Sequence, residues 1–433
     1  MQHSLKKILS KLFPSINQNQ NSVQSRSIQK KQLLVDVSEL VQRDAKTGIQ
    51  RVVRSTLKEL LLFPPDGYTV EPVYATKKSS YHYARRFTAK FLSKKKINSN
   101  DSVVETRQGD VFLALDFQAD IIIAQKEFLV RFRKRGGTLY FVIYDLLPIT
   151  LPDYFHSGMS ATHKLWLETI TGVGDGALCI SRSVADEFKE WIQNYSQNLC
   201  KPFNIGWFHL GADISSSLPT SRLPKRYNKL FQKQSKIPNI LMVGTIEPRK
   251  GHAQALAAFE LLWQQGIDIA LVIVGKTGWD VKIITTQLCR HKELNKRLFW
   301  FDNVSDGALL KLYKAATGVL MASSGEGFGL PLIEAAQHNC PILARDLPVF
   351  FEVAGNHASY FSGFTPEELA DAIKQWNNAL IDRTAPETKD IEWLTWKEST
   401  GQLLALLSNP DHPNWAHYIN PSTSFTLPDV TGN

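Results

Sequence analysis

Short apolar segments rich in β-branched residues recur along the chain from residue 31 and alternate with longer amphipathic segments. Runs of the first kind predict strands, and the longer ones predict helices. The predicted strands of the first half are QLLVDVSEL, YTVEPVYA, VFLALDF, TLYFVIYDL, GALCIS and NIGWFHLG, and its predicted helices include IQRVVRSTLKELL and ADIIIAQKEFLVRFRKRG. This alternation is typical of a mostly parallel, doubly wound sheet.

A second alternating series begins at residue 239, after a Ser-, Pro- and Lys-rich segment (214–238) that predicts an interdomain linker. Its predicted strands are NILMVG, ALVIVG, RLFWFDNV, GVLMASS, PILARD and ASYF, with helices from Gly251 to Gly266, over DGALLKLYKAA and from Leu330. We therefore predict an α/β fold of two Rossmann-like domains, 31–213 and 239–385, facing across a cleft. In such sheets ligands bind beyond the carboxyl ends of the strands.

The two ends of the chain depart from this pattern. Residues 1–30 combine a short basic amphipathic segment with a Gln-, Asn- and Ser-rich stretch, which predicts either a helix that docks on a membrane surface or a solvated tail. The segment 386–433 contains an aromatic-rich helix from Ile391 and then a stretch that we expect to be disordered. We expect Trp166, Trp393 and Trp396 to serve packing.

Composition adds limits on the partners. The net charge is +9, and residues 1–110 carry 20 Lys and Arg against 9 Asp and Glu. This basic third suits an anionic membrane surface or a phosphate-bearing acceptor, whereas no nucleic-acid-binding module accompanies it. No run of eighteen apolar residues exists, and the first residues do not form a secretory signal. Four cysteines without metal-ligand spacing indicate a reducing compartment and no structural metal.

The first candidate site is the loop in MVGTIEPRKGHAQAL, residues 242–256. A predicted strand ends at Gly244, and a helix begins near Gly251. The N–H groups of a helix N-terminus suit a phosphate, and Arg249 and Lys250 add two cations there. The alternative is an ordinary connection with solvated charges.

The second candidate is ASSGEGFGLPLIEAAQHNCPILA, residues 322–344. Glu326 lies in a loop with three glycines, and Glu334 follows eight residues later in a helix. Carboxylates of this kind could bond hydroxyl groups of a sugar and a ribose. The alternative places Glu334 on the helix surface and Glu326 in a plain turn. Because both loops follow strands of one sheet, they should open at the same edge and together suit a nucleotide-diphosphate sugar.

The EPRKGH loop and the Glu326–Glu334 spacing around GFG resemble the signature of retaining GT-B glycosyltransferases of family four, the "group 1" glycosyl transferases. The resemblance implies that Arg249 and Lys250 hold the donor diphosphate and assist its departure. It also implies that Glu326 contacts the donor sugar and Glu334 the ribose. The backbone of Gly327, Phe328 and Gly329, with Gly244, would line the donor pocket. The family works without a bound metal, and the C-terminal helix of this fold commonly crosses back onto the N-terminal domain.

The N-terminal half resembles the same family less closely. Gly48 would lie at the start of the first helix, facing the donor phosphates, and Arg51 nearby would serve the phosphate or the acceptor. Tyr144 occupies the usual histidine position of the family's His-Asp segment, while Asp145 remains as an acceptor contact or a turn cap. For His209 a core or hinge role is expected.

Together these features predict a cytoplasmic retaining hexosyltransferase without a cofactor, peripheral at the inner membrane face. The pattern looks closest to bacterial polysaccharide mannosyltransferases, so GDP-mannose is the favoured donor and a growing surface polysaccharide or lipid-pyrophosphate-linked glycan the acceptor. A UDP-sugar-dependent transferase of the same fold is the main alternative. A phosphorylase, an epimerase and a catalytically silent glycan-binding or scaffold subunit are the others.

Overall fold

The computed structural model describes residues 30–44, 47–92, 100–195, 202–213, 237–302 and 304–419. The predicted basic tail, nearly all of the predicted linker and Cys200 lie outside these residues. Within the described part, no helix is long and apolar enough to cross a membrane.

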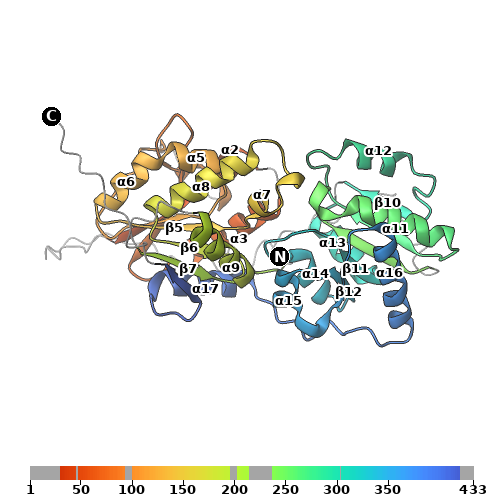
Figure 1. Ribbon diagram of the computed structural model, residues 1–433. Coiled ribbons are helices and arrows are strands. Elements are labelled where there is room, and N and C mark those ends of the chain that lie inside the picture. Colours follow the sequence, from red (N-terminus) through yellow and green to blue (C-terminus); the bar gives the residue numbers. More distant parts are fainter. Residues whose placement is uncertain are drawn as a thin grey trace. The chain divides into compact units, whose positions relative to one another are not determined.

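The first sheet consists mainly of parallel strands from the first half of the chain (Figure 1). Its strands are β1 (Lys31–Asp36), β2 (Tyr68–Tyr74), β3 (His82–Tyr83), β4 (Val111–Ala114), β5 (Thr138–Ile143), β6 (Gly176–Cys179), β7 (Phe203–Trp207) and β14 (Trp415–Ile419). They lie in the order β14-β7-β6-β5-β4-β1-β2-β3, and only the edge strands β3 and β14 pair antiparallel. A strand order that runs outward in both directions from the β1–β4 pair is that of the predicted doubly wound domain.

Helices cover both faces of this sheet. They are α2 (Ser38–Gln42), α3 (Gly48–Leu62), α4 (Arg85–Phe91), α5 (Ala119–Ala124), α6 (Lys126–Lys134), α7 (Leu147–Thr150), α8 (Met159–Val173) and α9 (Arg182–Tyr195), with the 3-10 turn η1 (Pro152–Tyr154). Side chains alternate along β1, so Leu33 and Val35 pack with α3 while Leu34 packs with α5, α6 and α8. Two hydrophobic cores, one on each face, result from this alternation.

The single helix predicted over residues 119–136 is divided in the structure. Gln125 separates α5 from α6, and its buried side-chain amide donates hydrogen bonds to the carbonyls of Thr76 (2.8 Å) and Ser79 (3.2 Å). The apolar periodicity continues through this break, so the pattern alone predicted one helix. A tertiary contact with the loop after β2 decided the division.

The second half forms a separate, fully parallel sheet. Its strands are β8 (Asn239–Val243), β9 (Ala270–Val274), β10 (Leu298–Phe301), β11 (Gly318–Met321), β12 (Ile342–Arg345) and β13 (Ser359–Phe361), in the order β10-β9-β8-β11-β12-β13. The covering elements are α11 (His252–Gln264), α12 (Lys282–Arg290), α13 (Asp306–Ala315), α14 (Leu330–Ala336), α15 (Pro348–Ala354) and α16 (Pro366–Ile381), with the turns η3 (Pro248–Lys250) and η4 (Gly355–His357). The predicted pair of Rossmann-like domains is therefore confirmed.

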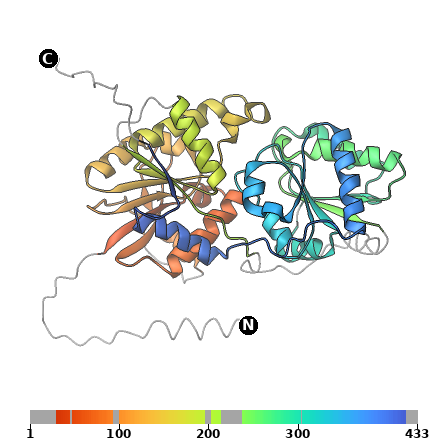
Figure 2. The same ribbon diagram turned by 60° about the horizontal axis from the view of Figure 1, so that its bottom comes forward.

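The end of the chain returns to the first sheet. Helix α17 (Trp396–Ser408) packs on α3, and in Figure 2 the blue α17 lies among the red and orange elements of the first half. Strand β14 then pairs antiparallel with β7, so the prediction that this stretch is disordered is wrong for residues 415–419. Trp166 and Trp396 are buried as predicted, whereas Trp393 is 41% exposed.

Candidate active site

The two loops singled out in the sequence follow neighbouring strands. Strand β8 pairs in parallel with β11, so the loop that carries Arg249 and Lys250 and the loop that carries Glu326 leave the same edge of the sheet. The turn η3 ends at Gly251, whose left-handed backbone (φ +74°) allows α11 to begin at His252. The three candidate side chains come together at this edge.

Glu326 is the centre of the cluster, and its side chain is 9% exposed. Lys250 Nζ contacts Glu326 Oε1, Ser323 Oγ donates to the same oxygen at 2.7 Å, and Arg249 Nη1 lies 3.4 Å from Oε2. Burial by itself raises the pKa of Glu326, but Lys250 and Arg249 lower it to about 2. The carboxylate is therefore ionised at neutral pH and neutralised by two cations.

Arg249 is held by further acceptors. Its Nη1 donates to the carbonyl of Gly325 at 3.0 Å, and its Nη2 lies 3.0 Å from Glu247 Oε2. Burial lowers the pKa of Arg249, but the carboxylates of Glu326 and Glu247 raise it above its ordinary value. The buried Nε of Arg249 has no hydrogen-bond partner in the described part of the chain. A buried donor of this kind can accept an anionic ligand.

A buried arginine that the sequence analysis missed supports both loops. Arg345, at the end of β12, donates from Nε to the carbonyl of Ser323 (3.1 Å) and from Nη2 to Gln254 Oε1 (2.6 Å) and the carbonyl of Ala322 (3.2 Å). Its Nη1 also donates to the carbonyl of Gly363. The sequence motif PILARD gives no signal for this role, because the partners lie in distant segments.

Glu334 is buried, so the alternative of a surface helix residue is excluded. Its Oε1 pairs with Arg51 Nη1, and its Oε2 accepts a hydrogen bond from the Tyr313 hydroxyl at 2.7 Å. Arg51 lies in the first turn of α3, which begins at Gly48, so this ion pair joins α3 to α14. The structure thus groups Arg51 with the predicted donor residues rather than with Asp145.

The glycine-rich loop lies directly against the first half. A Cβ atom at Gly327 would be 1.9 Å from the carbonyl oxygen of Tyr144, so this close approach requires glycine. Ser181 Oγ donates to the carbonyl of Gly327 at 2.8 Å, and the buried Phe328 ring lies 5.4 Å from that of His209. Gly329 directly precedes α14. The site is therefore built from both halves of the chain.

Residues 226–386 match the family model described as Glycosyl transferases group 1. The chain carries a group 1 glycosyl transferase domain. All of the β8 and β11 loop residues lie within this transferase domain, including Gly244, whose N–H closes β8 by donating to the carbonyl of Val274 at 2.9 Å.

Several curated proteins are similar over most of the chain. The serotype-specific mannosyltransferase WbdA of Escherichia coli is 41% identical over 377 residues, which are 86% of this chain and 44% of WbdA. The O-antigen chain mannosyltransferase RfbU of Salmonella typhimurium is 30% identical over 158 residues, 34% of this chain and 44% of RfbU. The chain spans about half the length of the curated relatives that it matches.

Solved structures show the GT-B fold. Anabaena HepE in complex with UDP and glucose has a TM-score of 0.58 at 16% identity, covering 88% of this chain and 100% of HepE. Sucrose-phosphate synthase from Thermosynechococcus elongatus has a TM-score of 0.60 at 13% identity, covering 88% and 98%. The predicted fold of the transferase is confirmed by these likenesses.

Tyr144 and Asp145 lie at the end of β5, close to the donor loop. The Tyr144 hydroxyl points into the core and donates to the carbonyl of Leu115 at 2.8 Å. Asp145 Oδ1 accepts from the N–H of Leu147 at 3.2 Å, which is the turn-cap arrangement. The charge of Asp145 also contributes to the raised pKa of Arg249, so Asp145 belongs to the electrostatics of the site.

The described residues contain no group of three or more His, Cys, Asp or Glu side chains that could hold a metal ion. The positive charge of the site comes instead from Arg249 and Lys250. Chemically, this arrangement can bind an anion beside a carboxylate that accepts hydroxyl hydrogen bonds.

Proposed function

We propose that this chain is a retaining glycosyltransferase that moves a hexose from a nucleotide-diphosphate sugar to a growing surface polysaccharide or lipid-linked glycan. The observation that carries the proposal is the cluster of Arg249, Lys250 and Glu326 at the edge of the second sheet. Two cations suit the diphosphate, and the carboxylate suits sugar hydroxyl groups.

The donor that we favour is GDP-mannose. This choice draws on the relatives, since WbdA and RfbU are both described as mannosyltransferases. A UDP-sugar is the second candidate, because the HepE structures contain UDP, UDP-glucose or UDP with glucose. The base would be selected at the outer end of the pocket beyond Glu334, where we place the ribose.

In the proposed reaction, the bond between the anomeric carbon and the diphosphate oxygen breaks, and its electron pair leaves with the nucleotide diphosphate. The acceptor hydroxyl oxygen forms the new bond on the same face of the sugar and gives its proton to the departing diphosphate. Arg249 and Lys250 stabilise the negative charge that develops on the leaving group. We propose no bound metal and no cofactor, because these two cations can supply the charge neutralisation.

The acceptor would approach from the first half, where Asp145 lies near the cations. We place the reaction at the cytoplasmic face of the membrane, with the basic N-terminal third near an anionic surface or a lipid-pyrophosphate. A glycan acceptor carried on lipid pyrophosphate would bring its own negative charge to that region.

The test combines binding and turnover. Thermal unfolding of the full chain is measured with GDP, UDP, ADP and TDP, and we expect the largest rise in Tm with GDP. Transfer from GDP-mannose to a mannose-terminated acceptor is then followed by mass spectrometry with and without EDTA. We expect transfer in both cases, and we expect it to disappear in the Arg249→Ala/Lys250→Ala variant.

Three results would count against the proposal. Equal Tm shifts for all four nucleotides would remove the base preference. Full transfer by the double variant would remove the assigned role of the cations. Binding of a nucleotide sugar with no turnover on any acceptor would favour a silent subunit.

A further inference from the structure

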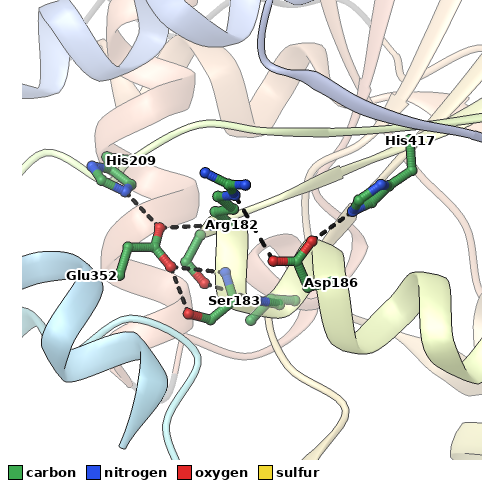
Figure 3. Close-up of polar contacts among 8 residues, drawn as sticks. Arg182, Ser183, Asp186, His209, Glu352 and His417 are labelled. Carbon is green, nitrogen blue, oxygen red and sulfur yellow. Dashed lines mark hydrogen bonds and ion pairs between the residues drawn. The ribbon is translucent and has the colours of Figure 1, made fainter.

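Glu352 in α15 reaches across to the first half of the chain (Figure 3). Its Oε1 accepts from the N–H of Arg182 at 2.7 Å and lies 2.8 Å from His209 Nε2. Its Oε2 accepts from the N–H of Ser183 at 2.7 Å and from the Ser183 hydroxyl at 2.6 Å. A single carboxylate of the second half therefore holds four groups of the first half.

The contact satisfies the start of a helix. The first N–H groups of a helix have no partner within it, and a negative charge near them is favourable. At the start of α9, Glu352 accepts from Arg182 and Ser183, and Ser181 Oγ accepts from the N–H of Val184 at 3.1 Å. Two of these three amides depend on a carboxylate about 170 residues away in the sequence.

The groups that Glu352 holds are next to those that contact the donor loop. Ser181, which precedes Arg182, donates to the carbonyl of Gly327. His209, the fourth partner of Glu352, packs its ring against Phe328. Both the β6–α9 turn and His209 thus link Glu352 to the loop that carries Glu326.

We propose that Glu352 is a positioning residue for the donor site: it fixes the start of α9 and His209 so that Ser181 and His209 hold the Gly327–Phe328 backbone against the first half. The inference rests on the proposed transfer function. Glu352 touches neither Glu326 nor the two cations, so it acts on the donor through the loop and not by contact.

The electrostatics agree with this geometry. Burial by itself raises the pKa of Glu352, but the hydrogen bonds from His209, Ser183 and Arg182 lower it below its ordinary value. The carboxylate is thus ionised near neutral pH and interacts favourably with the dipole of α9. An amide in its place would offer one acceptor oxygen in place of two.

The same helix offers a matched control. Asp186, one turn further along α9, lies 2.6 Å from His417 Nε2 of β14 (Figure 3). This pair is also a carboxylate–histidine contact between distant segments, but it holds the edge strand of the first sheet. Loss of this pair should therefore disturb α9 without reaching the donor loop.

The experiment compares Glu352→Gln with His417→Gln in the full chain. For transfer, we expect Glu352→Gln to lower kcat/KM about tenfold, mainly through a higher KM for the nucleotide sugar, with His417→Gln near wild type. For hydrogen exchange without donor, we expect faster exchange of the amides of Arg182 and Ser183 and of residues 325–329 in Glu352→Gln alone. Ser183→Ala, which removes one of the four contacts, should shift both readouts in the same direction by less.

Each outcome decides one question. Kinetics and exchange of Glu352→Gln equal to those of His417→Gln would overturn the inference, and so would a lower Tm with unchanged kinetics. If Glu352→Gln does not fold, Ser183→Ala and Glu352→Asp carry the same comparison. Absence of transfer by the wild type would reject the proposed function, while the exchange comparison would still show whether Glu352 holds the donor loop.

Discussion

Arg51, in the first turn of α3, forms an ion pair with Glu334 of α14, 283 residues further along the chain. The carboxylate also accepts a hydrogen bond from Tyr313, so both of its oxygens have partners. If Glu334 binds the donor ribose, the ribose hydroxyls must share or replace the contact with Arg51. The ion pair therefore links donor binding to the contact between α3 and α14.

The Arg51–Glu334 pair should be strongly coupled. In a double-mutant cycle with Arg51→Ala and Glu334→Gln, we expect a coupling of about 2 kcal/mol in the free energy of urea unfolding, because Glu334 is buried. The exposed pair Arg131–Glu127 in α6 serves as control and should couple by about 0.5 kcal/mol or less. Equal coupling in the two pairs would contradict a buried, specific contact.

Gly327→Ala should impair function more than folding. The added methyl group would lie 1.9 Å from the Tyr144 carbonyl oxygen, so the donor loop must move away from the first half. We expect kcat/KM for transfer to fall about 100-fold, whereas each sheet keeps its own core. Gly401→Ala in α17 is the control, since a Cβ there meets nothing within 4 Å and should add about 0.5 kcal/mol of stability. Wild-type kinetics for Gly327→Ala would argue against the close approach.

His252 should make stability depend on pH in the acidic range. Burial, with a smaller effect of Lys250, lowers the pKa of this histidine to about 3. Its contribution is fully present above the unfolded pKa of about 6.5 and is lost as the pH falls below that value, because the unfolded chain then binds one more proton. The wild type should lose up to about 1.4 kcal/mol per pH unit more than His252→Asn below pH 6.

This comparison is made by urea unfolding of both proteins at several pH values between 7.5 and 4.5. Asp116 and Glu187, whose pKa values burial raises to about 7, affect both proteins alike and cancel in the difference. Parallel pH profiles for the two proteins would show that His252 is not held neutral.

Trp415 should stabilise the edge of the first sheet. Its ring lies 5.9 Å from that of Tyr140 and covers Gly206 of β7, and its Nε1 donates to the carbonyl of Asn409 at 3.1 Å. We expect Trp415→Ala to destabilise the protein by about 2 kcal/mol, observed as a lower Tm. Trp393→Ala, at a 41% exposed position, should change Tm little. Equal Tm values for the two variants would place β14 outside the cooperative fold.

Local patterns in the sequence determined the framework of this protein. NILMV and GVLM are short apolar runs that become β8 and β11, and the loops after them carry Arg249, Lys250 and Glu326. Parallel strands place their carboxyl ends at one edge, so the meeting of these side chains could be predicted without coordinates. The helix N-terminus after Gly251 followed from the same local signals.

Tertiary structure decided the rest. Arg345, the Glu352–His209 contact and the Arg51–Glu334 pair each join segments distant in the sequence, and no local periodicity records which charge meets which. WAHYI became the edge strand β14 because β7 offered unpaired backbone groups, a condition that its own residues do not show. Apolar period and turn residues act over a few positions, whereas the partner of a buried polar group is set by the packing of whole elements.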